Sequence, residues 1–498
     1  MNLVKKLIAS LFAVIITVVI ALSPQIVNSF IFTDVNVTAP DWATFLINFS
    51  WIAFLLTFVL PTTYFVTYAM LSRTDRRYGV NASALAVPIV TAIMGFLIVY
   101  FFQSMITALI GYALIALSAV ALLLIIGNNE TVFYPTPTIL SFADDGELPL
   151  VSVVIPAYNE EEMIGQAIES ALNQTYPNIE VIVADDGSTD NTAKIASDFS
   201  NRYPGKVRLI RHEKNFGKFK ALNSGISVAK GEFIYHMDAD GSLAPDNVEK
   251  IVSIFNNDGE LGAAASMVAI SNDKNALTKL QQIEYLFEQL IVRYSQSTGK
   301  NVIICPGAGS LFKRESAKDL EVSDRTLTED ADYSFEVRRH GWKVGQEVDA
   351  VSFTEAPESL SAFTKQRIRW LYGVLQTITH HKWSLRDPWV IWAWLGYILT
   401  PFAMVVLFSI PVLGLILGQA YLAYFLPYFL IGFTIFAISR LIPLGLYKYR
   451  GKASLIPYLP LYIFYNTYLA MITIYCFAAW LIRRGVKVQY GSRLIHAK

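Results

Sequence analysis

The chain is poor in cysteine and in charge. Its 498 residues include two cysteines, and Asp, Glu, Lys and Arg together make up only 16%. Cys305 lies in the polar middle of the chain and Cys476 in a hydrophobic run, so we expect no disulfide between them and see no sign of an oxidising compartment. The 40 basic and 40 acidic residues cancel. Without a net basic field, the sequence gives no indication of a nucleic-acid partner.

Hydrophobic residues, in contrast, make up 54% of the chain and concentrate at its two ends. This is more than an ordinary soluble protein contains. Four apolar runs fall within the first 126 residues, at 7–32, 45–71, 84–102 and 106–126. Each is about long enough to cross a hydrocarbon core of about 30 Å. The sequence therefore predicts an N-terminal membrane region over residues 1–127 with four transmembrane helices.

The distribution of charge orients these spans. Lys5 and Lys6 precede the first run and three arginines follow the second, whereas the intervening loop carries Asp34 and Asp41 and no base. The positive-inside rule then places the N-terminus in the cytoplasm, and four spans return the chain to that side. A cleaved signal peptide is the alternative for the first run, but that run is long and three more follow.

After a linker at 128–149, residues 150–363 alternate β-branched strands with helical segments. We expect strands at 151–156, 180–184, 207–211 and 231–237, and helices at 160–172, 192–199 and 221–229. This alternation predicts an α/β domain with a largely parallel sheet and covered faces. Ligands bind such sheets beyond the carboxyl ends of the strands. Asn159, Asp186 and Asp238 each follow a predicted strand, so we expect them to converge on one crevice.

Six motifs follow one another along this region: VSVVIPAYNE, VADDGSTDNT, NFGKFKALNSG, HMDADG, TEDADYSFEVRRHGW and QRIRW. In this order they resemble family 2 glycosyltransferases. QRIRW and the membrane flanks narrow the resemblance to the membrane synthases of cellulose, chitin, hyaluronan and poly-N-acetylglucosamine. It implies a Rossmann-like GT-A catalytic domain, inserted between N- and C-terminal transmembrane helix bundles, that uses a nucleotide sugar.

The DAD triplet predicts a metal site. Asp238 and Asp240 place two carboxylates at the end of a predicted strand, and hard oxygen ligands suit Mg²⁺ or Mn²⁺ bound to diphosphate oxygens. The metal would neutralise charge on the departing nucleoside diphosphate. The resemblance makes Asp240 the more direct ligand and includes Asp238 in the donor site.

The resemblance also implies further donor contacts. Asp186 lies in the turn that corresponds to the uridine-contacting turn of the family. Lys218 and Lys220 are both candidates for a basic contact to the nucleotide, and we align Lys220 with the family's lysine. The first nucleotide-binding loop of the family corresponds to Pro156, Ala157, Tyr158 and Glu160.

The segment Thr328–Glu329–Asp330 is the expected catalytic motif. Asp330 would act as general base, because a sugar hydroxyl is a weak acid and a carboxylate with a raised pKa can take its proton. Glu329 reads more readily as a structural neighbour. No second nucleophile is evident, which favours a one-step displacement with inversion. In the loop 305–310, Gly307 and Gly309 would leave room for the acceptor sugar.

Residues 364–388 are expected to form amphipathic interface helices. Gln366, Arg369 and Trp370 share one helical face at i, i+3 and i+4. Gln366 and Arg369 would bind the donor, with Arg369 on the diphosphate, and Trp370 would stack on an acceptor sugar. Anchoring of a surface helix to the membrane is an alternative role, and both roles are compatible.

The C-terminal region, 389–482, again predicts membrane helices. Runs 389–417 and 421–441 are good spans, whereas 455–482 is apolar but interrupted by two prolines and Asn466. It is either a seventh span or a re-entrant or interfacial segment. The tail, 483–498, contains 487–493, which resembles a Trp-Gly-Thr-Arg gating element of hyaluronan-type synthases, with Tyr490 and Ser492 departing from it. The resemblance and the basic tail favour a cytoplasmic tail, with Arg493 on the donor.

These features predict a multi-pass plasma-membrane enzyme with a cytoplasmic catalytic domain. It would polymerise a sugar from UDP-GlcNAc, UDP-Glc or UDP-GlcA onto a growing polysaccharide and pass the polymer through its own membrane channel. One alternative is a transferase that adds a single sugar to a polyprenyl-phosphate or ceramide-like lipid. The other is a non-catalytic, sugar-binding membrane scaffold. Accessory subunits and oligomeric state stay open.

Overall fold

The computed structural model describes residues 148–256, 258–417, 436, 440, 452–482, 486–490 and 493–497. They divide into two compact units, one containing 148–391 and 476–497 and the other the described residues of 392–475. The four predicted N-terminal spans and most of the predicted span at 421–441 lie outside the described residues.

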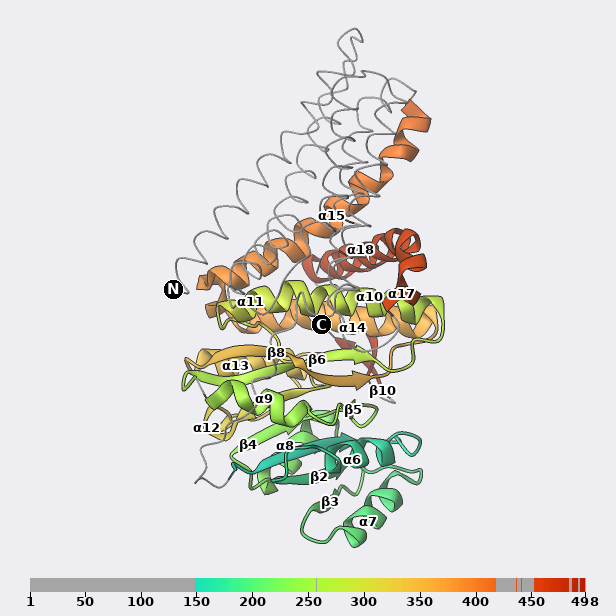
Figure 1. Ribbon diagram of the computed structural model, residues 1–498. Helices are drawn as coiled ribbons and strands as arrows, with labels where there is room; N and C mark the ends of the chain where they lie inside the picture. The colour runs from blue at the N-terminus through green and yellow to red at the C-terminus, as the bar shows by residue number, and fades with distance from the viewer. Residues whose placement is uncertain are drawn as a thin grey trace, which may run out of the picture. The chain divides into compact units, whose positions relative to one another are not determined.

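An eight-stranded mixed sheet forms the first unit, in the order β3-β2-β1-β4-β7-β6-β8-β5 (Figure 1). The first four of these strands are mutually parallel, and the expected strands are all present. The sheet departs from a parallel one at β7, which is antiparallel to both its neighbours, and at β5. The strands are β1 Val151–Ala157, β2 Ile179–Asp185, β3 Val207–Arg211, β4 Phe233–His236, β5 Ser242–Leu243, β6 Leu261–Ile270, β7 Ser310–Lys313 and β8 Lys343–Thr354.

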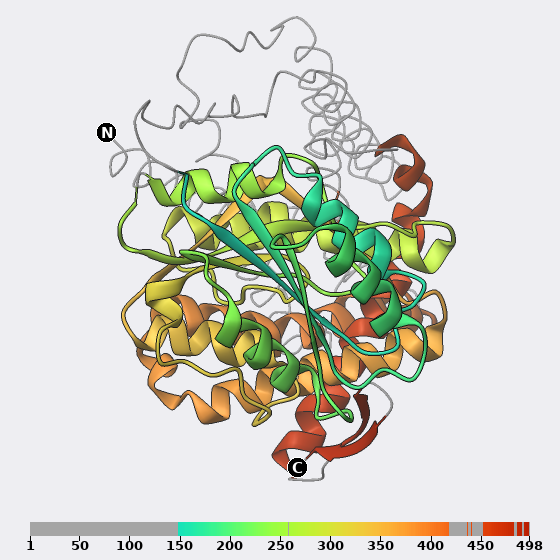
Figure 2. The same cartoon turned by 90° about the horizontal axis from the view of Figure 1, so that it is seen from below.

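Helices cover both faces of the sheet (Figure 2). One hydrophobic cluster joins the sheet to α6 (Ile164–Leu172), α7 (Thr192–Arg202) and α9 (Asn247–Asn256). A second cluster on the other face includes residues of α8 (Lys218–Val228) and α13 (Glu329–Arg339). The domain is therefore a three-layer α/β structure, as the alternating pattern predicted.

Strand β1 shows why the sequence folds this way. Its residues are all buried, with Val153 packing in the first cluster and Val154 in the second, because successive side chains point to opposite faces. Ser152 is the polar exception. Its hydroxyl donates to Glu180 Oε1 (2.6 Å) and accepts from the Gly231 amide (2.7 Å), so this buried hydroxyl is hydrogen-bonded.

Two long helical segments complete this unit, and the first of them contacts β6 and β8 (Figure 1). The first consists of α10 (Ala276–Phe287), the π-helix η2 (Glu288–Arg293) and α11 (Tyr294–Thr298), and the second is α14 (Leu360–His380). The side-chain amide of Gln289 accepts a hydrogen bond from the Val268 N–H and donates one to the Val268 C=O. It therefore satisfies the backbone groups of β6 as a neighbouring strand would. Arg367 of α14 forms a bidentate pair with Glu284 of α10, at 2.8 Å for each bond, and both residues are buried.

The remaining helices include the hydrophobic C-terminal ones. They are α12 Arg314–Ala317, η3 Lys382–Arg386, α15 Pro388–Leu417, α17 Lys452–Leu455, η4 Ile456–Tyr458 and α18 Leu459–Leu481. Within the part of the chain that the structure describes, one helix, Ile456–Leu481, is long and apolar enough to cross a membrane. It falls in the segment predicted as either a span or a re-entrant helix. The multi-pass topology stays a prediction.

The tail forms a β-hairpin of β9 (Val486–Tyr490) and β10 (Arg493–Ala497). Tyr490 pairs with Arg493 across its end, and β9 contacts α14. The hairpin thus belongs to the same unit as the catalytic motifs. The gating contact of Arg493 with a nucleotide stays a prediction.

The Glu284–Arg367 pair gives a first test. Glu284→Leu and Arg367→Met should each lower the free energy of unfolding by about 3–5 kcal/mol, because each leaves one buried charge uncompensated. The double variant should recover most of that loss. Denaturation of the detergent-solubilised chain measures this, with Glu260→Gln at the exposed Lys300–Glu260 pair as a control worth at most about 1 kcal/mol. Additive single and double losses would contradict the pairing.

Candidate active site

Several of the predicted donor-site residues lie at the carboxyl ends of β1, β2 and β4. Strand order reverses between β1 and β4, so the loops after these strands lie at the switch point where α/β sheets bind ligands. Pro156 and Ala157 end β1, and Tyr158 and Asn159 follow. Asn159 adopts a left-handed conformation (φ 56°), and its Oδ1 accepts from the Thr189 amide at 2.8 Å. The loops after β1 and β2 are therefore joined.

Asp186 is buried just beyond β2, and its carboxylate organises the chain before α8. It accepts hydrogen bonds from His212 Nδ1 (2.7 Å), the Phe216 amide (3.0 Å) and the Gly217 amide (2.7 Å). The next residue, Gly187, has φ 73° and approaches the backbone of Lys214 so closely that a Cβ would lie 2.6 Å from it. Asp186 thus fixes the start of α8, and its contact with uridine stays a prediction.

Lys218, in the first turn of α8, lies at the centre of the site. Its Nζ is 2.7 Å from Asp238 Oδ1 and 2.8 Å from Glu329 Oε1. Burial alone would raise the pKa of Glu329, but the charges of Lys218 and Arg369 outweigh it and bring that pKa to about 2. One cation therefore joins the metal motif to the catalytic motif and keeps Glu329 ionised.

Lys220, which we aligned with the family's lysine, is exposed two residues farther along α8. Residues two apart on a helix do not share a face, so Lys218 and Lys220 point in different directions. Lys218 is thus the lysine that contacts the carboxylates of both motifs, and the nucleotide contact of Lys220 stays a prediction.

Asp330 follows Glu329 in the first turn of α13 and faces the loop at 305–310. Its Oδ2 accepts from the Gly307 amide (3.2 Å), and its Oδ1 accepts from the Ala331 amide (2.8 Å). Burial, and then the charge of Glu329, raise the pKa of Asp330 above its ordinary value. Adjacent carboxyl groups with pKa values shifted in opposite directions are a pattern typical of acid–base sites.

The two glycines predicted to receive the acceptor differ in their surroundings. A Cβ at Gly307 would lie 3.0 Å from Lys218 Nζ and 3.4 Å from Asp238 Oδ1, so Gly307 borders the site. A Cβ at Gly309 would collide with Ser352 in β8, so the absence of a side chain there lets the loop pack on the sheet. An acceptor contact at either glycine stays a prediction.

The carboxylates around Asp240 suit a divalent cation. Burial, Asp238, Glu160 and Glu355 raise the pKa of Asp240 to about 7, and burial with Asp238 does the same for Glu160. Asp240 Oδ1 is buried without a hydrogen-bond partner. Within the described ranges no three His, Cys, Asp or Glu side chains meet the geometry of a metal site. A cation held by two carboxylates, water and diphosphate oxygens fits this arrangement.

The QRIRW segment lies in α14. Gln366 Oε1 is buried and has no hydrogen-bond partner, and the charge of Arg369 lowers the pKa of Glu329. Trp370 has the Arg367 guanidinium 4.7 Å from its ring centroid. Arg369 therefore acts electrostatically on the catalytic motif, whereas Trp370 packs beside the buried ion pair. The side chain of Arg493 lies outside the described part of the structure.

Sequence reasoning missed two features near the catalytic motif. His236, at the end of β4, is buried, and burial with the Lys218 charge lowers its pKa to about 3, so it is neutral. Asp332 lies in the first turn of α13, as expected for a helix-start charge, but it is also buried and accepts hydrogen bonds from Arg325 and Ser323. One sequence gives no signal that tells a buried carboxylate from the other acidic residues at the start of α13.

Comparison with known proteins supports the family suggested by the motifs. Residues 152–321 match the model of glycosyl transferase family 2. The poly-β-1,6-N-acetyl-D-glucosamine synthases of Staphylococcus epidermidis and Staphylococcus aureus are 32% and 30% identical over 240 and 242 residues. These alignments cover 48% of this chain and 56% and 57% of the relatives, so the chain spans just over half the length of the curated relatives it matches.

Among solved structures, a mannosyltransferase from Pyrobaculum calidifontis in complex with GDP-Man and Mn²⁺ aligns over 80% of this chain and 99% of its own. The TM-score is 0.48 and the sequence identity 20%. The family match bears out the resemblance for residues 152–321, which match a glycosyl transferase family 2 domain, and the mixed sheet agrees with a GT-A-like fold.

The contrast between the two lysines is testable. Lys218→Met should lower the rate of sugar transfer by about 100-fold, because the carboxylates of Asp238 and Glu329 would lose their shared cation. Lys220→Met should cost no more than about threefold, as for a solvated surface charge. UDP release by the purified variants measures both. Equal losses, or a larger loss for Lys220→Met, would return the role to Lys220.

Proposed function

We propose that the protein is a processive, inverting glycosyltransferase that lengthens a polysaccharide from a UDP-sugar at the cytoplasmic membrane face. The proposal rests mainly on the ion pairs of Lys218. Its ammonium group lies within hydrogen-bonding distance of Asp238 in the predicted metal motif and of Glu329 in the predicted catalytic motif. Donor diphosphate and acceptor hydroxyl must approach each other in such a transfer, and these ion pairs bring their expected partners together.

Asp330 is the general base in this proposal. Its raised pKa makes it a stronger proton acceptor than an ordinary carboxylate, and the Gly307 amide orients its Oδ2. It takes the proton of the acceptor hydroxyl as that oxygen attacks the anomeric carbon and the bond to the diphosphate breaks. Glu329 stays ionised beside Lys218 and has no proton to give.

The departing diphosphate is stabilised by the cations around the crevice. Lys218 and Arg369 are the protein's contributors, with Gln366 as a further polar contact. Asp238 and Asp240 would hold Mg²⁺ or Mn²⁺, which supplies Lewis-acid stabilisation of the leaving group when bound. Tyr158, Glu160 and Asp186 would complete the nucleotide side of the crevice, with Pro156 and Ala157 as its floor. Thr328 is the residue just before the helix that carries the base.

N-acetylglucosamine is the first donor sugar to test, because both named relatives are poly-N-acetylglucosamine synthases. The membrane helices would form the channel for the product. In the tail, Arg493 would close over the nucleotide, a role to which the attachment of the hairpin to the catalytic unit lends support. Trp370 and the Gly307–Gly309 loop would guide the acceptor.

Product analysis with radiolabelled UDP-N-acetylglucosamine, UDP-glucose and UDP-glucuronic acid tests the proposal. Long polymer would support processive synthesis, whereas a lipid-linked monosaccharide would overturn processivity and the absence of transfer would overturn catalysis.

Asp330→Asn should bind UDP within about threefold of wild type but lose transfer by about 1,000-fold, because an amide cannot accept the proton. Wild-type turnover by Asp330→Asn would place the base elsewhere, with Glu329 as the next candidate.

The pKa of Asp240 predicts how metal binding depends on pH. Below pH about 7 a cation must displace the proton of Asp240, so its affinity in the presence of UDP should fall by up to about tenfold per pH unit. Above that pH the affinity should level off. Asp240→Asn should bind weakly and lose this dependence. Glu160→Gln should shift the fall to lower pH, since Glu160 helps to raise the pKa of Asp240.

Calorimetric titration with MnCl₂ between pH about 5.5 and 8 measures these affinities across the range of the shifted pKa. Undiminished UDP release in excess chelator, or a pH-independent affinity that Asp240→Asn leaves intact, would contradict the metal assignment.

A further inference from the structure

One face of α14 is docked on the segment that carries the base. We call Gly373, Gln376, Thr377 and His381 the docking stripe, in which His381 is the residue just after the helix. Their spacing of 3, 4 and 8 residues from Gly373 places them on one side of α14. The same side continues toward the N-terminus through Trp370, Arg369 and Gln366, so one helical face joins the QRIRW residues to the stripe.

Gly373 makes the closest approach. A Cβ at this position would lie 2.7 Å from both Cγ2 and Oγ1 of Thr328 and 3.0 Å from its backbone nitrogen. Thr328 is the residue before α13 and two before the base. One turn farther along α14, Gln376 Oε1 accepts from the Leu327 amide at 3.0 Å. The glycine therefore lets α14 contact the backbone that leads into the catalytic motif.

His381 makes the second attachment, on the other side of the base. Its Nε2 lies 2.8 Å from Asp332 Oδ1, and Trp383 Nε1 donates to its Nδ1 at 3.2 Å. An indole N–H can only donate, so Nδ1 must accept and the His381 proton sits on Nε2, directed at Asp332. Both His381 and Asp332 are buried.

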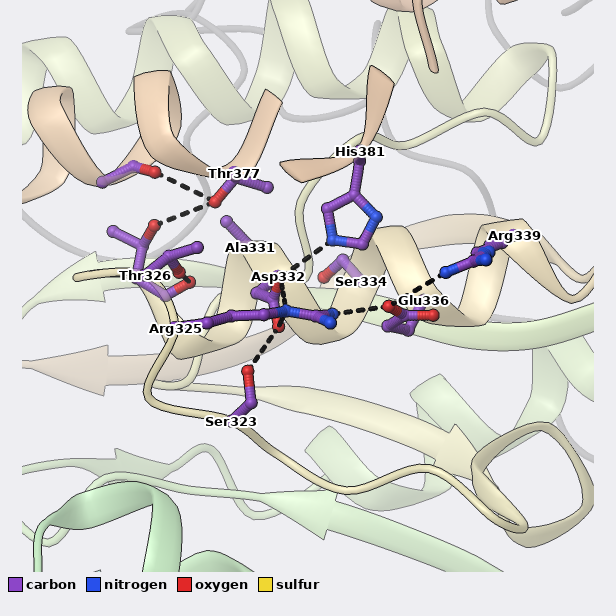
Figure 3. A network of polar contacts seen from close by, with 12 residues as sticks. Ser323, Arg325, Thr326, Ala331, Asp332, Ser334, Glu336, Arg339, Thr377 and His381 are labelled. Atoms are coloured by element: carbon purple, nitrogen blue, oxygen red, sulfur yellow. Dashed lines mark hydrogen bonds and ion pairs between the residues drawn. The ribbon is translucent and has the colours of Figure 1, made fainter. Parts of the chain in front are cut away.

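Asp332 is held from other directions as well (Figure 3). Arg325 Nε lies 2.9 Å from both carboxylate oxygens, and Ser323 Oγ donates at 2.9 Å. Burial would raise the pKa of Asp332, but these hydrogen bonds, that of His381 first, lower it below its ordinary value. The carboxylate is thus a fixed, ionised anchor rather than a mobile charge at a helix start.

We propose that the docking stripe is a positioning device, which sets Asp330 at a defined place relative to Arg369 and Gln366. Asp330 lies between the two attachment points at Thr328 and Asp332, so its position follows that of α14. The inference rests on the proposed function, in which Asp330 and Arg369 act on opposite ends of one reaction. It assigns positioning roles to Gly373 and His381, which contact Thr328 and Asp332.

Gly373→Ala tests the device without weakening the helix, because alanine has the higher helix propensity. A displacement of the catalytic motif by a fraction of an ångström should lower kcat by about 10- to 100-fold. The KM for the UDP-sugar that the wild type turns over and the Kd for UDP should stay within about threefold, since the donor crevice is untouched. Gly165→Ala in α6 is the matched control, because its Cβ would meet no atom closer than 3.8 Å.

A double-mutant cycle separates positioning from general destabilisation. Thr328→Ala removes the two side-chain atoms that the new Cβ would strike. Adding Gly373→Ala in that background should therefore cost no more than about threefold in kcat. His381→Leu should lower kcat at constant UDP affinity, whereas His381→Gln, which keeps a donor toward Asp332, should restore most of it.

The outcomes distinguish this inference from the function on which it rests. Transfer by wild type together with a wild-type kcat for Gly373→Ala would overturn the inference alone. So would an equal cost of Gly373→Ala in the wild-type and Thr328→Ala backgrounds. A fall in UDP affinity parallel to the fall in kcat would also overturn it, because that is the signature of a purely structural role. Absence of transfer by wild type would instead overturn the proposed function.

Discussion

The ion pairs of Lys218 are the interaction on which the site depends. Asp238 and Glu329 are 91 residues apart in sequence, and one ammonium group lies within 3 Å of both. The position of that ammonium is fixed in turn by Asp186, whose carboxylate holds the amides of Phe216 and Gly217 just before α8. The carboxyl end of β2 therefore determines where α8 begins, and α8 determines where the metal and catalytic motifs meet.

The Lys218 ammonium also makes the pKa values of two adjacent carboxyl groups differ. Glu329 is paired with Lys218 and remains ionised, whereas Asp330 is buried beside that negative charge and its pKa is raised. Acidic residues at the start of α13 are also favoured by the helix dipole. The two carboxyl groups of the TED motif thus differ in pKa because they face different neighbours, not because their chemistry differs.

The strands and the family of this domain could be predicted from the sequence, whereas the side-chain contacts between its segments could not. The strands around β1 follow from β-branched runs, and the order of six motifs identified the family because each motif is local. The contact of Lys218 with Asp238 and Glu329 was not foreseen, since alignment of a short motif does not show which side of a helix meets those carboxylates, and the nucleotide contact of Lys220 stays a prediction. The buried role of Asp332 was missed for a similar reason, because its partners Arg325 and His381 come from other segments.

The close approach of Gly373 to Thr328 could not be predicted either, because a helical glycine gives no signal until its neighbour in space is known.

A structure of the full chain with UDP and Mn²⁺ tests the central claim most directly. The account predicts that the cation binds Asp240, that the diphosphate lies beside Lys218, and that Asp330 faces the unoccupied acceptor side next to Gly307. A diphosphate bound away from Lys218, or Asp330 turned from the anomeric position, would contradict it.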